Sequence, residues 1–248
     1  MSLPPSLSVL IFLLLHFSPN CWVGPPRVPY EAISTVATRV QQEIVNKHNT
    51  LRRLVEPPAK NMLKMEWNEE AAQNARYWAE KCEVQHSPQP GRQIKDHSCG
   101  ENLLFATYSL SWSDAIQIWY NESKNFQYGT GATKRGAMVS HYTQLVWSTS
   151  YQIGCGAANC PKEKSFQVLF ICQYCHAGND PETMNTPYKV GPPCGDCPKN
   201  CNNRLCTNPC PFADNASNCL EAIKALGCKH ELTEAYCKAS CKCTIEIK

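Results

Sequence analysis

Long apolar segments are nearly absent from this chain of 248 residues. The one exception is Leu7–Phe17, which reads LSVLIFLLLHF. This run is long enough for the core of a signal peptide but too short to cross a bilayer. We therefore expect residues 1–24 to be a signal peptide and the mature protein to be secreted and extracellular, without a transmembrane anchor. An uncleaved anchor is the disfavoured alternative, because the apolar run ends so early.

An excess of charge of one sign is also missing. The 24 lysines and arginines nearly balance the 21 aspartates and glutamates, which leaves a formal net charge of +3. Both signs are interleaved along the chain, and no basic run occurs. We therefore expect neither nucleic acid nor a bulk anionic membrane as the main partner, because both select clustered positive charge.

The common catalytic motifs are missing too. The sequence has no nucleophile elbow, no HExxH motif and no glycine-rich phosphate loop. These absences disfavour the most familiar hydrolases and phosphoryl-transfer enzymes. We therefore do not expect the protein to be an enzyme.

Cysteine, in contrast, is abundant, with 17 residues. Six are spread over the body, ten crowd into residues 194–248, and Cys21 lies in the predicted signal peptide. The tail is too short and polar to bury a self-sufficient core, so disulfides must stabilise it. Such density is typical of oxidising compartments. Cys194 and Cys197 have the spacing of half a zinc ribbon. Disulfides are favoured there, because the chain is expected to be secreted and no second CxxC lies at the expected separation.

Three segments of the body have the apolar periodicity of helices. The first covers residues 40–54. The second follows Asn68 and the third follows Ser111, two residue types that commonly cap helix N-termini. The apolar stripe of the third helix reaches Trp119, and Glu122 is expected on the same stripe.

Strand signals follow the helices. HYTQLVW at residues 141–147 is expected to be a strand on which His141 alternates with Thr143 and Leu145. The continuous apolar run Val168–Ile171 is typical of a strand that is buried on both faces. Helices first and strands later predict an α+β fold, in which helices flank one mainly antiparallel sheet.

Beyond the body, the chain divides into three further parts. Residues 179–193 are polar and rich in turn residues, which predicts a connector. A tight disulfide hinge is expected at residues 194–206. A small module is expected at residues 210–243, where ASNCLEAIKALGC and ELTEAYCKASCKC have helical spacing.

Several motifs resemble those of the CAP superfamily. SHYTQLVWSTS at residues 140–150 and LFICQYCHAGND at 169–180 are similar to its two signature motifs, and CGEN at 99–102 matches another landmark. The tail cysteines are spaced as in the cysteine-rich secretory proteins, and GNDPETMNTPY looks most like their mammalian epididymal members. The resemblance implies an α-β-α sandwich CAP domain over residues 36–178, followed by the hinge and an ShK-like module that resembles channel-blocking toxins.

The resemblance also implies a disulfide pairing, which spacing alone leaves open. The implied bridges are Cys82–Cys160, Cys99–Cys175 and Cys155–Cys172 in the body, Cys194–Cys201 and Cys197–Cys206 in the hinge, and Cys210–Cys243, Cys219–Cys237 and Cys228–Cys241 in the module.

Four residues resemble the family's cleft tetrad, namely His86, Glu101, Glu122 and His141. Two imidazoles and two carboxylates suit Zn²⁺. The long separations of these residues do not show whether they converge. Taken alone, the residues favour a structural His–Glu hydrogen bond without metal, because a lone histidine is far more often structural than a metal ligand. The resemblance favours a weak zinc site that the protein does not require. A metal-dependent hydrolase or protease that uses these residues is an alternative function.

In the module, Tyr236, Lys238 and Lys242 are the candidate contact with a cation channel, because ammonium groups suit acidic vestibules. A merely solvated Lys238 is the alternative. The resemblance implies a sperm-coating protein that modulates calcium channels and contacts sperm-surface and egg-surface proteins during maturation and fertilisation. Because other CAP proteins bind sterols, a sterol or lipid carrier is a further alternative.

Two sequons offer acceptors for N-glycans, at Asn121 and Asn215. Asn215 lies in a polar loop, where glycosylation is expected. Asn121 is expected within a helix beside a candidate metal ligand, so its occupancy is left open.

Overall fold

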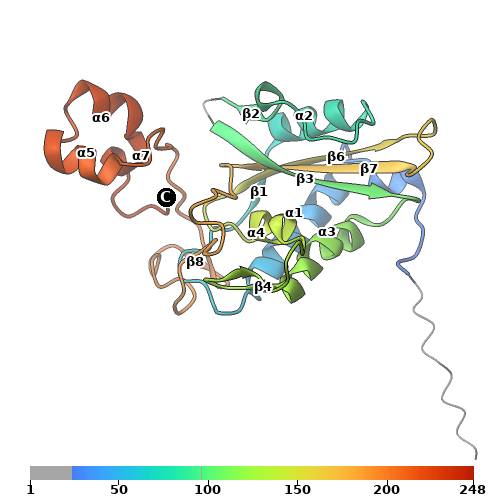
Figure 1. Cartoon of the computed structure of the whole chain (residues 1–248), viewed down its shortest axis with the longest axis horizontal. Helices are drawn as coiled ribbons and strands as arrows, with labels where there is room; N and C mark the ends of the chain where they lie inside the picture. The colour runs from blue at the N-terminus through green and yellow to red at the C-terminus, as the bar shows by residue number, and fades with distance from the viewer. Residues whose placement is uncertain (1–23, 96) are drawn as a thin grey trace, which may run out of the picture.

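The computed structural model describes residues 24–95 and 97–248 (Figure 1). Nearly all of the predicted signal peptide lies outside the described residues. Within the described ranges, no helix combines the length and apolar character needed to span a bilayer.

A five-stranded sheet forms the centre of the body, in the order β1-β6-β7-β3-β2. All of its neighbouring strands are antiparallel except β1 and β6. Every residue of the central strand β7 is buried, as its continuous apolar run predicts. The strands are β1 (Glu66–Trp67), β2 (Gln93–Ile94), β3 (His97–Ala106), β6 (Gln152–Asn159) and β7 (Val168–Cys175).

Helices cover both faces of this sheet, which gives the expected α-β-α sandwich (Figure 1). Helix α2 (Glu69–Ala79) packs on β6 and β7. Its approach to β6 requires glycine, since a Cβ at Gly154 would lie only 2.1 Å from the Ala72 nitrogen. Helices α1 (Thr38–Arg52), α3 (Trp112–Tyr120) and α4 (Ser140–Leu145) form the other layer.

Local capping explains where two helices begin. The Asn68 side chain accepts a hydrogen bond from the Ala71 nitrogen (2.9 Å), and the Ser111 hydroxyl accepts one from the Asp114 nitrogen (3.1 Å). Each bond satisfies an N–H group that lacks a partner inside its helix. The predicted start of each helix is therefore confirmed.

Two local predictions in the body are wrong. Residues 140–145 form helix α4 rather than a strand. Tyr142 to Leu145 are all buried, so the alternation in the sequence does not correspond to a buried and an exposed face. Glu122 lies not on α3 but in the following 3₁₀ helix η3 (Asn121–Asn125). From there its carboxylate accepts the backbone N–H groups of His141 and Tyr142, which supplies the N-terminal cap that the α4 sequence lacks.

The connector, residues 179–193, contains neither helix nor strand but packs on the body. Tyr188 is buried, and its carbonyl accepts a hydrogen bond from the Tyr128 hydroxyl. The hinge follows and docks through Cys206, whose backbone bonds to Met62 and Lys64. The remaining short elements are η1 (Tyr30–Ile33), η2 (Gln89–Gly91), β4 (Phe126–Gln127), β5 (Gly131–Ala132), β8 (Cys201–Asn202) and β9 (Leu205–Cys206).

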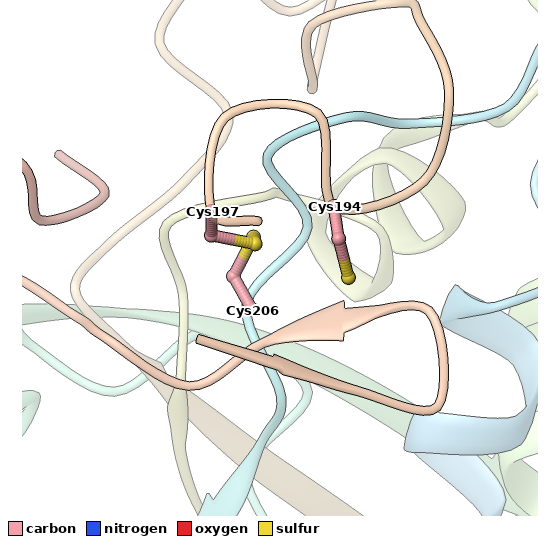
Figure 2. A group of neighbouring side chains, drawn as sticks. All are labelled: Cys194, Cys197 and Cys206. Carbon is pink, nitrogen blue, oxygen red and sulfur yellow. A yellow bond between two sulfur atoms is a disulfide. The ribbon is translucent and has the colours of Figure 1, made fainter. Parts of the chain in front are cut away.

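The module consists of α5 (Cys219–Leu226), α6 (Glu231–Tyr236) and α7 (Lys238–Lys242), which pack against one another. The described chain contains eight disulfides, and they join the pairs that the resemblance implies. In the hinge, the sulfur atoms of Cys194, Cys197 and Cys206 lie within 4.8 Å of one another (Figure 2). All three are bonded in disulfides, so none is free to act as a zinc thiolate.

Arg52, the last residue of α1, is buried without a carboxylate partner among the described residues. Its guanidinium donates instead to four backbone carbonyls, which belong to Leu63, Leu145, Trp147 and Ser148. Burial lowers the pKa of Arg52 to about 9, which leaves the side chain protonated at neutral pH. The cation therefore ties α1 to two loops and to the C-terminal end of α4.

Candidate functional site

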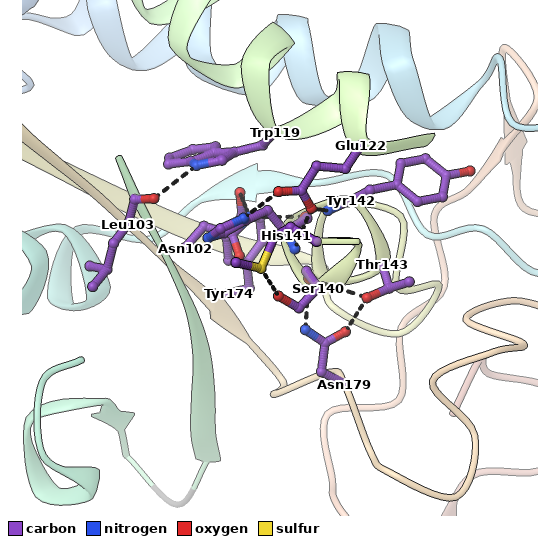
Figure 3. A network of polar contacts seen from close by, with 11 residues as sticks. Asn102, Leu103, Trp119, Glu122, Ser140, His141, Tyr142, Thr143, Tyr174 and Asn179 are labelled. Atoms are coloured by element: carbon purple, nitrogen blue, oxygen red, sulfur yellow. Dashed lines mark hydrogen bonds and ion pairs between the residues drawn. The ribbon is translucent and has the colours of Figure 1, made fainter. Parts of the chain in front are cut away.

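Glu122 and His141 form one of two His–Glu pairs (Figure 3). A Glu122 oxygen lies 2.6 Å from His141 Nδ1, and the other oxygen accepts the two backbone N–H groups at the start of α4. The carboxylate thus orients the imidazole and the helix that carries it. No hydrogen bond to His141 Nε2 is formed within the described chain, so this nitrogen is the one available to a ligand.

The surroundings of His141 restrict the ring further. The indole of Trp119 stacks near it, with ring centroids 6.3 Å apart. The Asn102 amide donates to the His141 carbonyl (3.0 Å). On the other side of α4, Asn179 accepts from the Thr143 hydroxyl (2.7 Å) and donates to the Ser140 carbonyl (2.8 Å), so the second signature segment holds the first (Figure 3).

His86 and Glu101 form the other pair. His86 Nδ1 lies 3.0 Å from one Glu101 oxygen, which also accepts the Ser87 N–H. The second oxygen accepts from the Ser87 hydroxyl (2.5 Å) and from Gln173 Nε2 (3.2 Å). The carboxylate is fully buried, whereas 53% of the His86 side chain is exposed. The ring is therefore anchored at one nitrogen and open at its edge.

The balance of forces on Glu101 favours its ionised form. Burial alone would raise the pKa of its carboxyl, but the hydrogen bonds from His86, Ser87 and Gln173 outweigh burial, and the net pKa is lowered. Glu101 is therefore a carboxylate at neutral pH, held by its neighbours.

Strand β3 connects the two pairs. Glu101 and its neighbour Asn102 point to opposite faces of the strand. Glu101 meets His86, and Asn102 meets the α4 segment that carries His141. Here β3 pairs only with β7, because β2 reaches no further than Ser98. Glu101 and Asn102 thus contact the two pairs from a part of β3 that forms an open edge of the sheet.

The four residues do not gather as a compact four-ligand centre. Among the described residues, no three of their ligand atoms lie within 4.8 Å of one another. Both carboxylates already accept hydrogen bonds from the protein, so the donor set that remains is the free Nε2 of each histidine. Histidine ligands oriented by carboxylates in this way are common around zinc. The residues therefore do not form a closed four-ligand centre, and the ring nitrogens that they leave free are the Nε2 atoms of His86 and His141.

Sequence reasoning did not identify Ser87, Gln173, Asn102 and Trp119 as parts of the site. Gln173 carries the clearest signal, since it is a polar residue inside a continuous apolar strand and is fully buried. A buried amide of this kind must find a hydrogen-bond partner. Its Nε2 donates to the Gly91 carbonyl (3.0 Å) and to Glu101 (3.2 Å).

The other predicted residues lie away from these pairs. Tyr236 is half-exposed, and Lys238 and Lys242 are exposed on α7, where the Lys242 ammonium lies 4.8 Å from the centre of the Phe212 ring. The exposed Asn121 begins η3, and its side chain accepts a bond from Gln117. Asn215 is exposed in the loop before α5.

Replacing Glu101 by Gln is expected to lower the free energy of unfolding at pH 7 by about 1–3 kcal/mol, because charge-assisted hydrogen bonds are lost. A carboxyl whose pKa is lowered by folding stabilises the fold at pH values above 4.5, its pKa in the unfolded chain. This contribution is lost as the pH falls through the pKa of the folded state. Denaturant titrations between pH 7 and 3 should therefore show the difference shrinking below about pH 4.5. Glu66→Gln, at an exposed position on β1, is the control. A Glu101→Gln effect that is independent of pH would show that the stability does not come from the ionised carboxylate.

Comparison with known proteins places the chain in a family. The model described as "Cysteine-rich secretory protein family" matches residues 45–174, and the model described as "Crisp" matches residues 194–248. The chain is 48% identical over 240 residues to human cysteine-rich secretory protein 3, which covers 96% of this chain and 98% of that protein. It is 47% identical to cysteine-rich secretory protein 2 of Cavia porcellus, with coverage of 97% and 98%.

Solved structures share the fold of the body. Schistosoma mansoni venom allergen-like protein 4 is 28% identical with a TM-score of 0.52, and the match covers 63% of this chain and 97% of that one. NaASP2, whose crystal structure was determined with Zn²⁺, is 26% identical with a TM-score of 0.56, over 69% and 96% of the two chains. Because both family models match and relatives are 47–48% identical over nearly the whole chain, the chain belongs to the cysteine-rich secretory protein family.

Proposed function

We propose that this protein is a secreted, non-enzymatic binding and regulatory glycoprotein whose C-terminal module inhibits a cation channel. The observation that carries the proposal is the module itself, in which three disulfides hold three short helices and leave a basic and aromatic face exposed. Such cross-linked groups lose little conformational freedom when they bind a partner.

The proposed contact surface lies where α6 meets α7. Tyr236 ends α6 and is 52% exposed. Lys238 and Lys242 are four residues apart on α7, so they share one side of that helix. The Phe212 ring beneath the Lys242 ammonium supports it through a cation–π contact. Two ammonium groups beside a phenol suit the acidic vestibule of a cation-selective pore.

We propose a supporting part for the body. It provides a large platform from which the module is presented, together with surface for contacts with sperm and egg proteins. The calcium-channel target and the part in sperm maturation and fertilisation rest on the resemblance to epididymal members of the family.

The channel proposal predicts that Lys238→Ala combined with Lys242→Ala weakens inhibition of calcium-permeable sperm currents, because the cationic contact is lost. Whole-cell recording with the oxidised full chain would measure the shift in half-inhibitory concentration. Lys224→Ala, at an exposed lysine on α5, is the matched control and should leave inhibition unchanged.

A second arm of this experiment locates the activity within the chain. Residues 194–248, produced under oxidising conditions, should retain inhibition, and residues 24–193 should have none. Inhibition by the body alone, with none from the tail, would overturn the proposal.

A second candidate function is weak zinc binding by His86 and His141. It is supported by the free Nε2 atom of each ring and by the Glu partner that fixes each tautomer. The related NaASP2 was crystallised with Zn²⁺. Bound zinc would supply a Lewis-acidic cation at the open edge of β3. Hydrolysis is less well supported, because both carboxylates are occupied by internal hydrogen bonds and neither is free to act as a general base toward water.

Zinc uptake by the untagged full chain, measured by titration calorimetry, should disappear when His86 and His141 are both replaced by Ala. Glu101→Gln should lower the affinity for zinc by about 10- to 100-fold, since the residue that hydrogen-bonds to a metal-binding histidine tunes the affinity for the metal. His230→Ala changes an exposed histidine of the module and serves as the control. Stoichiometric uptake that persists in the double variant would eliminate this site.

A further inference from the structure

The module and the body are separated by a cavity of about 700 Å³. Its body wall includes His97, Ser98, Thr149 and His176, and its module wall includes residues 212–217. The module helices pack on one another, and Figure 1 shows them beyond the end of the sheet, next to the start of β3.

One sequon lies in the wall of this cavity. Asn215 and Ser217, the first and third residues of Asn-Ala-Ser, both line it. The backbone there is fixed, because the Asn215 N–H donates to the Tyr236 carbonyl (2.7 Å). The preceding Asp214 accepts from the Ser240 N–H and hydroxyl (2.9 and 2.5 Å). The exposed Asn215 side chain forms no hydrogen bond within the described residues. A group attached to it would therefore leave the module at a defined point.

The opposite wall has groups that suit a sugar. The rings of His97 and His176 are stacked, with centroids 4.1 Å apart and planes at 24°. His97 Nδ1 and His176 Nε2 are buried and have no hydrogen-bond partner in the described part of the chain. Both nitrogens are closed to solvent, so contacts between these residues and a sugar in the cavity would come from other atoms of the two rings. Ser98 and Thr149 add hydroxyls, so the wall combines aromatic faces with hydrogen-bonding groups.

Charge in the cavity is low, as a neutral sugar requires. Burial, and then the neighbouring His97, lower the pKa of His176 to about 4, so that its ring is uncharged at neutral pH. Asp214, the one acidic side chain among the described residues that line the cavity, is already engaged by Ser240. Lys248 also lines the cavity, and its ammonium donates to the Cys243 carbonyl (3.1 Å).

From this juxtaposition we propose that the cavity is the docking site of the protein's own N-glycan, whose first N-acetylglucosamine units extend from Asn215 and pack against His97 and His176. The acetamido and hydroxyl groups bond to the polar wall, and the pyranose C–H faces lie on the imidazoles. The glycan thereby holds the module against the body. This inference concerns the module's orientation and does not depend on which channel the module contacts.

The test uses the full chain secreted from mammalian cells, with glycopeptide mass spectrometry at Asn215 and hydrogen–deuterium exchange of the segments 97–99 and 176–178. The glycosylated protein should protect both segments, and Asn215→Gln should lose that protection. Ser217→Thr keeps the acceptor sequence and should keep the protection. Asn121→Gln, at the other sequon, should leave it unchanged.

Two further variants separate docking from mere attachment. His97→Ala and His176→Ala should leave Asn215 glycosylated. Each should remove the glycan-dependent protection of the segment that carries the other histidine, namely 176–178 for His97→Ala and 97–99 for His176→Ala. Trimming by an endoglycosidase that leaves one N-acetylglucosamine should retain most of the protection, whereas complete removal should abolish it. An unoccupied Asn215, or equal exchange in occupied and unoccupied protein, would overturn the proposal.

Discussion

The contact on which the rest of the structure most depends is the buried guanidinium of Arg52. A buried cation is costly unless each of its donors finds an acceptor. Here three carbonyls from two loops and one from the end of α4 surround the guanidinium, which the planar fork of arginine allows and an ammonium does not. One of these carbonyls, that of Leu145, belongs to the C-terminal end of α4, where a positive charge is favourable.

The two loops that Arg52 contacts also form the backbone hydrogen bonds to the connector and to the hinge. The Leu63 N–H bonds to the Ser148 carbonyl, so the loops are joined to each other. The Ser148 N–H then donates to Pro187 of the connector, and the backbone on either side of Leu63 bonds to Cys206 of the hinge. A side chain in the first helix thus fixes where the connector and the hinge dock, and through them where the module begins. The His–Glu pair on α4 depends on the same support, because Arg52 holds the end of that helix while Glu122 holds its start.

Much of the fold could be predicted from the sequence because its signals are local. The caps at Asn68 and Ser111 and the buried run of β7 each depend on neighbouring residues, and each was found in the expected place. Helix α4 was missed because its cap comes from Glu122, 19 residues earlier in the chain. The contacts of Arg52 could not be predicted for a similar reason. Its acceptors lie 11 to 96 residues away in the sequence, and they are backbone carbonyls, which no residue type identifies.

The candidate site, too, could be predicted from the sequence only in part. The family resemblance indicated the two histidines and two glutamates, but only the structure shows that each carboxylate is occupied by its own histidine and by backbone or side-chain donors. This distinction reduces the side chains of the tetrad that are free to bind a ligand from four to two. Residues such as Gln173 complete the site through contacts that span many positions in sequence, and no motif marks them.

The central claim is that Arg52 joins the body, the connector and the hinge into one cooperative unit. Denaturant unfolding of the full chain tests it most directly, with Arg52→Lys compared with Arg53→Lys, since the neighbouring Arg53 makes one exposed bond to the Asn203 carbonyl. Arg52→Lys should lower the free energy of unfolding by about 3 kcal/mol or more, because buried carbonyls lose their donors. Arg53→Lys should change it by less than about 0.5 kcal/mol. Equal and small effects of the two substitutions would contradict the claim.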